Sequence, residues 1–401
     1  MDNFKSTILE LSIGEHGMFK RTLEKKLLQL RNQFPVLALF GPRQSGKTTL
    51  ARTLFPNYRY VNLESFEEQE FAIEDPKGFL MRFREEEGII LDEIQKTPKL
   101  LSYVQLEVDQ HQALGRFVIT SSQNILLNQH VSQTLAGRVA ITTLLPLSIE
   151  ELKGACELPK IAEEAIFQGC YPRVYQHHAD PIIFAESYIR TYVERDVRDV
   201  LKITSLLEFQ KFMRLCAARV GQLLDFTDLS KDAGISLPTV KSWLSVLEAS
   251  YIIFLLQPHH ANFNKRVVKT PKLYFYDTSL VCNLLRLTNS DDVYDHYLRG
   301  GLFESMIISD FFKKCYHQGF PPNVYFWRDK LGNEVDCLLE EGSRLIPIEI
   351  KSSATVQSEM FGTLEKWCEW AGVAPGSGKI IYSGEEDQAR KQGSILSWKS
   401  L

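Results

Sequence analysis

Long apolar runs are absent from this 401-residue sequence, and none approaches the roughly 20 residues that a membrane span requires. The N-terminus lacks the basic start, apolar core and small-residue cleavage site that together mark a secretory signal. The seven cysteines are scattered, odd in number and without CxxC or Cys/His ligand spacing, which argues against disulfides and zinc. We therefore expect a cytoplasmic protein with reduced thiols and no membrane partner.

A surplus of positive charge is missing as well. Lys and Arg number 46 against 50 Asp and Glu, a formal net charge of -4, so no global basic field points to nucleic acid. Any contact with DNA must come from a local patch. The chain is also too long for one ordinary core and suits two or three domains of roughly 150 residues each.

A phosphate-binding pattern is present between residues 39 and 55, LFGPRQSGKTTLARTLF. The apolar run PVLALF (35–40) leads into it, and a run of helix-forming residues follows. In a strand–loop–helix of this kind, backbone N–H groups point at the phosphates, Lys47 lies near the β and γ phosphates, and Thr48 can ligate Mg2+. The residues expected to bind ATP are Gly41, Pro42, Arg43, Gln44, Ser45, Gly46, Lys47, Thr48, Thr49 and Ser122.

A second apolar strand, GIILDEIQ (88–95), ends in two acids. Asp92 lies where it could complete the Mg2+ shell, and Glu93 lies where it could orient and deprotonate the attacking water. The alternative is a pair of surface acids at a strand end. A third strand, RFVITSSQN (116–124), ends in hydroxyls and an amide, and Ser122 or a neighbour could sense the γ-phosphate, although such residues also form ordinary turns.

Strand candidates alternate with helical segments through the first part of the chain. They cover residues 35–40, 58–63, 88–92, 116–121 and 139–145. This alternation predicts an α/β fold whose parallel sheet carries helices on both faces and its ligand at the carboxyl ends of the strands.

Seven short motifs occur together in one order. They are GPRQSGKTT, LDEIQ, ITSSQN, LAGR (135–138), GCYPRV (169–174), YIRTYVERDV (188–197) and KTPKLYFYDTSL (269–280). As a set they closely resemble the prokaryotic AAA-type ATPases that carry a C-terminal domain of unknown function, from about residue 20 to 355. The family's usual Gly-Ser after the third strand is Ser121-Ser122 here, and its Gly-Gly before Tyr-Pro is Gly169-Cys170.

Arg138, in LAGR, has two interpretations. As an arginine finger its planar guanidinium would reach the γ-phosphate of a neighbouring subunit, which requires a homo-oligomer. As a structural residue it would pair with a carboxylate of its own chain.

Residues 226–277 look like a winged helix. FTDLSKDA and LPTVKSWLSVLEASY predict two helices around a turn at Gly234, and YIIFLLQP and KLYFYD predict two strands that flank a wing. Basic and aromatic residues interleave there as on an edge that contacts phosphates, namely Phe263, Lys265, Arg266, Lys269, Lys272, Tyr274 and Tyr276. Winged helices also bind proteins, so the partner could be DNA or a protein.

The C-terminal stretch 324–353 predicts three strands joined by glycine-containing turns. Glu349 and Lys351 are two residues apart and leave the same face of their strand, and Asp336 can reach that face. Glu304, on a preceding amphipathic helix, could add a further ligand. Such a group could hold Mg2+ and orient water for phosphodiester cleavage.

The acids and the Glu-x-Lys strand resemble the PD-(D/E)XK nuclease superfamily, in which a helix acid, a strand Asp and a Glu-x-Lys strand recur. This resemblance implies a restriction-endonuclease-like α/β domain. A Glu-x-Lys on an edge strand also occurs as a surface ion pair, and a nuclease-like scaffold can bind without cutting.

We therefore predict a P-loop ATPase domain (1–155), a helical lid or linker (156–222), a winged-helix segment (223–285) and a nuclease-like domain (286–401). The predicted function is Mg2+-dependent ATP hydrolysis coupled to DNA handling. The alternative is an ATP-dependent switch that grips DNA or a protein partner and whose nuclease-like domain is inactive. A third hypothesis is a self-associating ATPase whose C-terminal fold mediates assembly.

Overall fold

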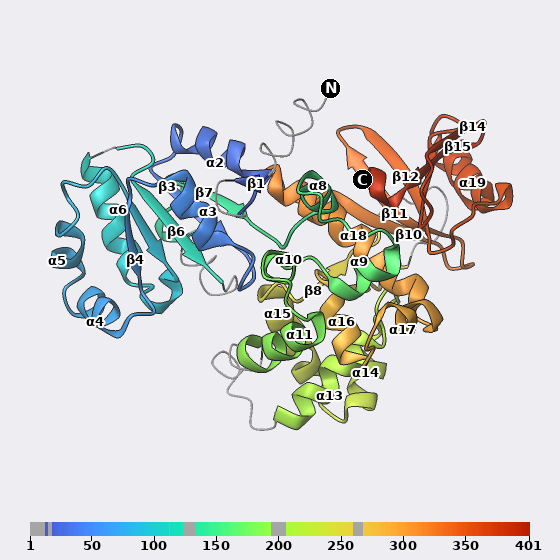
Figure 1. The fold of residues 1–401 in the computed structure, drawn as a ribbon, viewed down its shortest axis with the longest axis horizontal. Coiled ribbons are helices and arrows are strands. Elements are labelled where there is room, and N and C mark those ends of the chain that lie inside the picture. The colour runs from blue at the N-terminus through green and yellow to red at the C-terminus, as the bar shows by residue number, and fades with distance from the viewer. Residues whose placement is uncertain are drawn as a thin grey trace. The chain divides into compact units, whose positions relative to one another are not determined.

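The computed structural model describes residues 13–14, 18–111, 113–122, 131, 133–193, 206–259 and 268–401. The chain divides into two compact units, coloured along the sequence in Figure 1. Unit 1 comprises Met1–Leu147, Ala249–Tyr251 and Tyr316–Phe320. Unit 2 comprises Ser148–Glu248, Ile252–Cys315 and Pro321–Leu401.

Unit 1 contains a parallel five-stranded sheet with the strand order β4–β5–β6–β3–β7. The strands are β3 (Val36–Phe40), β4 (Arg59–Asn62), β5 (Ile89–Asp92), β6 (Phe117–Ser121) and β7 (Val139–Thr143). All five lie within the predicted ranges, so the predicted α/β sheet is confirmed. Strands β3, β5 and β6 are buried along their whole length, as expected for a parallel sheet covered on both faces. Their neighbouring positions bring the carboxyl ends of three strands together.

The helices of unit 1 connect these strands and cover the sheet (Figure 1). They are α2 (Leu23–Arg31), α3 (Lys47–Leu54), α4 (Phe66–Glu74), α5 (Pro76–Met81) and α6 (Leu100–His111), with a 3-10 turn at Ile94–Lys96 and a short pair β1 (Ile13–Gly14) and β2 (Met18–Phe19). Ala51 of α3 and Phe55 just after it share a buried cluster with Leu37, Ile90 and Val118 of the sheet. This packing holds the second half of α3 against the sheet.

Unit 2 begins with a largely helical region. Its helices are α8 (Ile149–Gly154), α9 (Ala162–Gln168), α10 (Pro172–Gln176), α11 (Pro181–Tyr188) with a π-helical continuation (Ile189–Val193), α13 (Leu206–Ala217), α14 (Phe226–Ala233), α15 (Leu237–Ala249), α16 (Thr278–Leu284), α17 (Ser290–Asp295) and α18 (Arg299–His317). The last residue of α15 and the last two of α18 belong to unit 1.

The elements predicted for the winged-helix segment are present. Helices α14 and α15 are followed by the antiparallel strands β8 (Ile253–Leu256) and β9 (Lys272–Phe275), and Gly234 ends α14 with a φ of 75°. The winged-helix topology itself stays a prediction.

The predicted phosphate-contacting edge is wrong for three of its residues. Lys272, Tyr274 and Tyr276 are buried, because this face of β9 packs inward, where Lys272 forms ion pairs with Glu304 and Glu334. Lys269 is exposed. Phe263, Lys265 and Arg266 lie outside the described residues.

The C-terminal part of unit 2 is a six-stranded mixed sheet with the order β10–β11–β12–β13–β15–β14. Its strands are β10 (Val324–Arg328), β11 (Glu334–Glu341), β12 (Arg344–Lys351), β13 (Gly378–Tyr382), β14 (Gln388–Arg390) and β15 (Gly393–Ser397). β10, β11 and β12 pair antiparallel, as the glycine-containing turns predicted, whereas β12, β13 and β15 run parallel.

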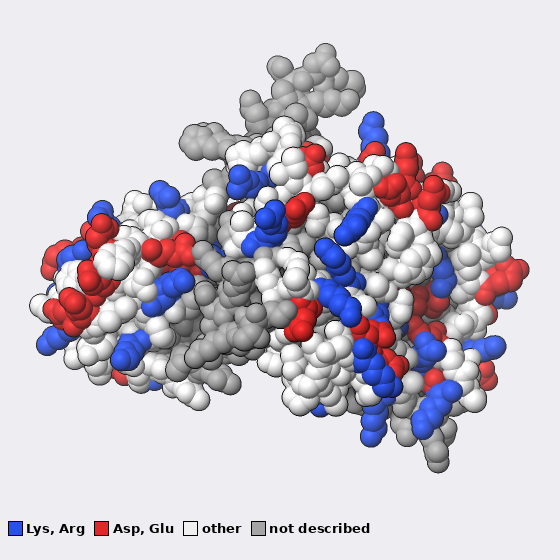
Figure 2. Space-filling model, turned by 90° about the horizontal axis from the view of Figure 1, so that it is seen from below, with Lys and Arg blue, Asp and Glu red and all other residues white. Residues whose placement is uncertain are grey.

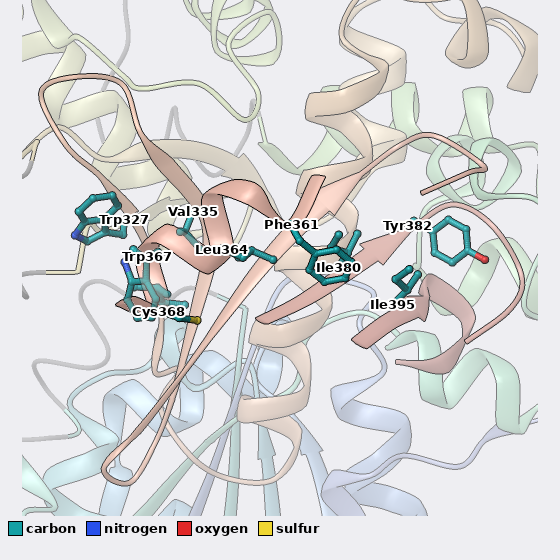
Figure 3. Packing of buried hydrophobic residues seen from close by; sticks show 10 residues of the cluster. Trp327, Val335, Phe361, Leu364, Trp367, Cys368, Ile380, Tyr382 and Ile395 are labelled. Atoms are coloured by element: carbon teal, nitrogen blue, oxygen red, sulfur yellow. The ribbon is translucent and has the colours of Figure 1, made fainter. Parts of the chain in front are cut away.

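Helix α19 (Gly362–Ala371) packs on this sheet, and 3-10 turns occur at Ser358–Phe361 and Trp398–Ser400. Figure 3 shows the buried cluster between helix and sheet, in which Trp367 and Leu364 of α19 meet Trp327, Ile380 and Ile395 of the strands. The strand register pairs Ile380 and Tyr382 of this core with Glu349 and Lys351 of β12, so the core adjoins the polar cluster described below.

The surface carries both signs of charge. On the face seen in Figure 2, Lys and Arg are interspersed with Asp and Glu, in keeping with the small net charge of -4. In the part of the chain that the structure describes, no helix is both long and apolar enough to cross a membrane.

Candidate nucleotide site and C-terminal carboxylate cluster

The loop between β3 and α3 requires its two glycines. Gly41 has a φ of 148°, and a Cβ there would collide with the backbone oxygen of Leu144. Gly46 adopts the left-handed conformation, with a φ of 96°, at the N-cap of α3. Glycine has no Cβ and therefore tolerates both positions. The chain can turn sharply here, with backbone N–H groups that face an anion.

Lys47 lies at the first position of α3, and its side chain returns to the start of the loop. The ammonium Nζ donates to the carbonyl oxygens of Gly41 at 2.9 Å and Pro42 at 2.7 Å. Lys47 is only 5% exposed, and these two hydrogen bonds hold its charged ammonium group at the loop. Of the other predicted loop residues, Pro42 and Ser45 are buried, Arg43, Gln44, Gly46 and Thr48 are partly buried, and Thr49 is exposed.

Asp92, at the end of β5, is a buried carboxylate that accepts hydrogen bonds from three sides. Thr48 Oγ1 lies 3.0 Å from both carboxylate oxygens, the Tyr60 hydroxyl donates to Oδ2 at 2.8 Å, and the Thr120 hydroxyl donates to Oδ1. Burial, the hydrogen bond to Asp92 and the charge of Asp92 raise the pKa of Tyr60, so the phenol stays a donor. The Thr48 hydroxyl and the Asp92 carboxylate are hard oxygen ligands and fit Mg2+.

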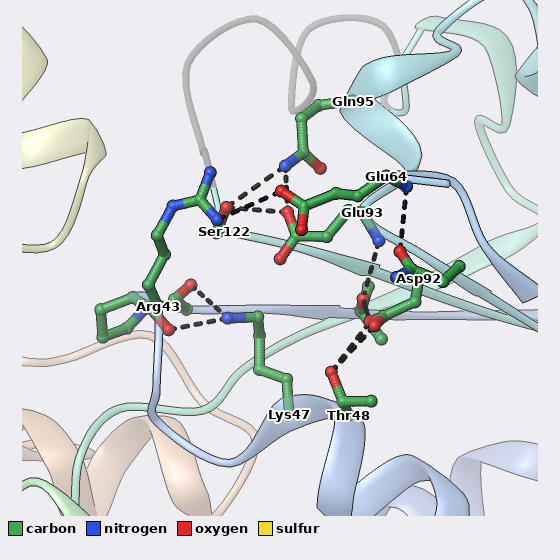
Figure 4. A network of polar contacts seen from close by, with 12 residues as sticks. Arg43, Lys47, Thr48, Glu64, Asp92, Glu93, Gln95 and Ser122 are labelled. Atoms are coloured by element: carbon green, nitrogen blue, oxygen red, sulfur yellow. Dashed lines mark hydrogen bonds and ion pairs between the residues drawn. The ribbon is translucent and has the colours of Figure 1, made fainter. Parts of the chain in front are cut away.

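Glu93 follows in a left-handed backbone conformation, with φ 58° and ψ 47°, which turns its side chain away from that of Asp92 (Figure 4). Ser122 Oγ donates to Glu93 Oε2 at 2.8 Å, and the Gln95 amide also donates to it. Burial alone would raise the pKa of Glu93, but the charges of Lys47 and Arg43 and these two hydrogen bonds outweigh burial and lower the pKa. Glu93 is therefore an ionised carboxylate at neutral pH.

Thr120 of β6 and Ser122, just after this strand, both reach the site. The Ser122 hydroxyl links Glu93 and Gln95, with Gln95 Nε2 at 3.2 Å, while Thr120 accepts from the Glu93 backbone N–H at 3.2 Å. Gln123 lies outside the described residues. Thr48, Asp92, Glu93 and Ser122 thus come together at the carboxyl ends of β3, β5 and β6, where the strand alternation predicted a ligand.

Two residues that the motifs did not indicate, Arg21 and His317, connect the phosphate-binding loop to the chain after β7. The buried guanidinium of Arg21 donates to the carbonyl oxygens of Ser45 at 2.8 Å and Leu145 at 2.7 Å, and lies 3.4 Å from His317 Nε2. The Leu145 N–H donates to the same Nε2 at 3.2 Å, so this nitrogen is the acceptor and the other ring nitrogen carries the proton. Arg21 and His317 thereby fix the loop's position relative to the chain that follows β7.

Arg138 pairs within its own chain. Its guanidinium binds Asp109 in a bidentate manner, with Nε at 2.5 Å from Oδ1 and Nη2 at 3.0 Å from Oδ2, and Nη1 donates to the Ala136 carbonyl. This is the local carboxylate pairing that the structural interpretation of Arg138 requires.

In the C-terminal sheet, Asp336, Glu349 and Lys351 share one face of the hairpin. Lys351 Nζ lies 2.5 Å from Glu349 Oε1 and 3.8 Å from Asp336 Oδ2, which also accepts the Ile350 N–H at 2.9 Å. Burial and the nearby Asp336 raise the pKa of Glu349 to about 8 even though Lys351 opposes this rise. The second oxygen of Glu349 is buried and has no hydrogen-bond partner among the residues described, which leaves an acceptor for a cation.

Glu304, on α18, is bound by residues of β9. Lys272 Nζ donates to Glu304 Oε1 at 2.9 Å and the Tyr274 hydroxyl donates to it at 2.5 Å, while Lys272 also pairs with Glu334. Burial raises the pKa of Glu304 to about 7, with Lys272 opposing and Asp336 adding to the rise. Nowhere in the described ranges are three or more His, Cys, Asp or Glu side chains arranged to hold a metal ion. The metal role of Glu304, Asp336 and Glu349 therefore stays a prediction.

Three family models match successive parts of the chain. Residues 33–153 match a family described as an AAA domain. Residues 160–291 match a domain of unknown function, DUF8612, and residues 299–401 match another, DUF4143. The first match covers the sheet and the phosphate-binding loop of unit 1.

Relatives are similar along most of their length. An uncharacterized protein of Mycobacterium tuberculosis is 25% identical over 346 residues, which cover 84% of this chain and 74% of the relative. An uncharacterized protein of Methanocaldococcus jannaschii is 21% identical over 400 residues, with 90% and 85% covered. A solved Walker-type ATPase of Pyrococcus abyssi has a TM-score of 0.47 at 16% identity, over 69% of this chain and 99% of its own. The match to the AAA domain, the parallel sheet and the phosphate-binding loop together support an AAA-type ATPase.

Proposed function

We propose that this protein hydrolyses ATP with Mg2+ and uses the reaction to handle DNA through unit 2. The observation that carries the ATPase part is the convergence of Thr48, Asp92 and the ionised Glu93 at one edge of the sheet. A nucleotide anchor alone needs the glycine loop and a lysine, whereas a carboxylate beside the γ-phosphate position also activates water.

Each residue has a defined part in this reaction. The backbone N–H groups of residues 43–48 and the Lys47 ammonium bind the phosphates, and Thr48 with Asp92 would hold Mg2+. When bound, this ion neutralises charge on the phosphate oxygens. Glu93 accepts a proton from the attacking water, and Ser122 keeps the Glu93 carboxylate pointed into the site by its 2.8 Å hydrogen bond.

The DNA-handling part is supported by the order of elements in unit 2. Helices α14 and α15 with strands β8 and β9 have the succession of a winged helix, and the sheet that follows brings Asp336, Glu349 and Lys351 to one face. In the nuclease-like assignment, Asp336 and Glu349 would hold a divalent cation, with Glu304 close by, and Lys351 would orient the water. Incubation of the full-length protein with plasmid and Mg2+ or Mn2+, with and without ATP, tests cleavage directly.

Metal binding at the C-terminal cluster is expected to stabilise unit 2 without nucleotide. Because the partly buried Asp336 carboxylate lies near the buried Glu349 carboxylate, a bound divalent cation relieves their repulsion and binds only the folded chain. We expect Mg2+ or Mn2+ to raise the thermal midpoint of full-length protein by about 5 °C at saturation.

The double variant Asp336→Ala/Glu349→Ala should lose most of this shift, whereas Glu341→Ala, an exposed acid on the same hairpin, should keep it. Thermal melts with a metal titration make the comparison. A shift that is the same in the wild type and the double variant would leave only a nuclease-shaped scaffold.

The second candidate is an ATP-dependent switch that grips DNA or a protein partner without cutting. Ion pairs within the cluster favour it, because Lys351 and Lys272 already neutralise Glu349 and Glu304. Intact plasmid in the cleavage assay, together with DNA or partner affinity that differs between ATP and ADP, would support this candidate.

An arginine finger from a neighbouring chain predicts cooperation between subunits. If Arg138 leaves Asp109 and reaches a neighbour's γ-phosphate, specific activity should rise with protein concentration, and a mixture of Arg138→Ala and Lys47→Ala proteins should regain part of the wild-type rate. A rate per chain that is constant over a wide concentration range, without recovery on mixing, would instead assign Arg138 to its bond with Asp109.

A further inference from the structure

Tyr60 reaches the candidate magnesium site from β4, a strand that none of the seven motifs covers. In the sheet it pairs with Ile90 of the neighbouring strand β5. Asp92 follows two residues after Ile90, and alternation along a strand puts these two side chains on the same face of the sheet. The long side chain of Tyr60 extends to Asp92, and its hydroxyl donates to Oδ2 at 2.8 Å.

The aromatic ring of Tyr60 is held in turn by α3. The guanidinium carbon of Arg52 lies 4.9 Å from the centre of the ring, within the range of a cation–π contact. Arg52 comes four residues after Thr48 on this helix, so both side chains leave the same side of α3. One side of α3 therefore meets the Tyr60–Asp92 pair twice, with Thr48 at the carboxylate and Arg52 at the ring.

The hydroxyl groups around Asp92 restrict how its carboxylate can turn. Asp92 is 5% exposed, and three hydroxyls from different elements donate to it, those of Thr48 on α3, Tyr60 on β4 and Thr120 on β6. A carboxylate has about four lone-pair positions, so three donated protons leave about one for a further partner. Because the donors come from three elements, together they fix the direction in which this remaining position faces.

We propose that Tyr60 is a positioning residue for the magnesium ion of Mg–ATP. Its hydroxyl, steadied by Arg52 at the ring, holds the Asp92 carboxylate in the orientation that binds the cation. This assignment rests on the Mg2+-dependent ATPase proposed above. Tyr60 acts through Asp92 in this role. Loss of the hydroxyl frees the carboxylate to rotate, so its oxygens are no longer preorganised for a divalent cation.

This role separates metal affinity from nucleotide affinity. The phosphates bind to the backbone N–H groups of the loop and to Lys47, whereas the metal depends on Thr48 and Asp92. Removal of a hydrogen-bond partner of a metal ligand typically weakens metal binding by about ten- to a hundredfold. A variant without the Tyr60 hydroxyl should therefore need more Mg2+, and excess Mg2+ should compensate.

The experiment compares full-length wild type with Tyr60→Phe, which loses the hydroxyl and keeps the ring. Tyr103→Phe is the matched control, because Tyr103 is an exposed tyrosine of α6 in the same unit. ADP is titrated calorimetrically in EDTA and across a Mg2+ series, which measures the metal requirement without turnover. In Tyr60→Phe we expect this requirement to rise about tenfold, and ADP affinity in EDTA to stay within about threefold of the wild type. Tyr103→Phe should match the wild type.

The ATPase rate is the second readout. At limiting Mg2+ the Tyr60→Phe protein should be slow, whereas at saturating Mg2+ its rate should return to within about threefold of the wild type. A structural role of Tyr60 would instead lower the rate at every Mg2+ concentration.

Arg52 is exposed and provides a variant that does not alter the Tyr60 side chain itself. Arg52→Gln should raise the Mg2+ requirement by about two- to fivefold, the effect of one exposed cation–π contact on the ring. Arg52→Lys keeps a cation over the ring and should stay closer to the wild type than Arg52→Gln. A wild-type Mg2+ requirement in Arg52→Gln would overturn the part assigned to Arg52.

An unchanged Mg2+ requirement in Tyr60→Phe would overturn the assignment, and so would a loss of rate that saturating Mg2+ does not restore. A wild-type protein that binds ATP with Mg2+ but never hydrolyses it would instead refute the proposed ATPase. In that case a raised Mg2+ requirement for ADP binding in Tyr60→Phe would still support the role of Tyr60.

Discussion

Replacement of Lys47 by alanine is expected to abolish ATP binding or reduce it by at least about a hundredfold, and hydrolysis should vanish with it. The loop would lose the ammonium group that its own geometry holds beside Gly41 and Pro42. Since Lys47 lies near the β and γ phosphates, ATP should be affected more than ADP.

Isothermal titration with ATP and ADP measures this loss. Because Lys47 is buried and bridges two loop carbonyls, its removal also disturbs the loop itself, so Lys47→Met serves as a second variant that keeps the aliphatic stem. Lys77→Ala, which removes an exposed lysine of α5, is the matched control and should behave as wild type. Wild-type turnover in the Lys47 variants would refute the assignment of the nucleotide site.

Replacement of Glu93 by glutamine is expected to preserve ATP binding, in contrast to the Lys47 variants, and to prevent hydrolysis, so that ATP persists on the protein. Glutamine is close in shape and its oxygen still accepts the hydrogen bond from Ser122, but it cannot take the proton of the attacking water. We expect a rate about a hundred to ten thousand times lower. Rapid-quench measurement of ATP and ADP on the protein distinguishes retained nucleotide from lost binding.

The pH dependence provides an independent check on Glu93. Its lowered pKa means that the carboxylate stays ionised as the pH falls through the ordinary range of glutamate. The wild-type rate should therefore decline only below that range, and the residual rate of Glu93→Gln should lack this decline. Equal loss of ATP affinity in Glu93→Gln and Lys47→Ala would make Glu93 a structural residue.

Much of the ATPase fold could be predicted because its signals are local. The β3 strand, the Gly41 and Gly46 turns and the first turn of α3 follow one another in the chain, and the apolar runs that end in Asp92 and Ser122 are just as compact. Parallel strands then bring their carboxyl ends together without any further information from the sequence. The hairpin that joins Glu349, Lys351 and Asp336 was predictable for the same reason, since alternation along a strand fixes the face of each side chain.

Contacts between distant segments could not be predicted in this way. Lys272 looked like a surface cation because charged residues are rarely buried, yet Glu304 and Glu334, 32 and 62 residues later, accept its charge in the interior. Arg21 lies 296 positions from the His317 that it meets. Neither Arg21 nor His317 belongs to a spacing pattern in the sequence. Only the completed fold shows that these two residues contact the phosphate-binding loop and the chain beside it.

The His317 contact affects how this protein can be divided. A fragment that ends near residue 155 would keep every motif of the ATPase but lose the imidazole that accepts from Leu145 and lies against Arg21. Such a fragment would be an incomplete ATPase domain rather than an independently folding one, because residues 316–320 and 249–251 are part of the same compact unit. A frameshift or stop codon anywhere before His317 would accordingly damage nucleotide turnover and the C-terminal region together, and a phenotype from such an allele could not be assigned to the C-terminal region alone.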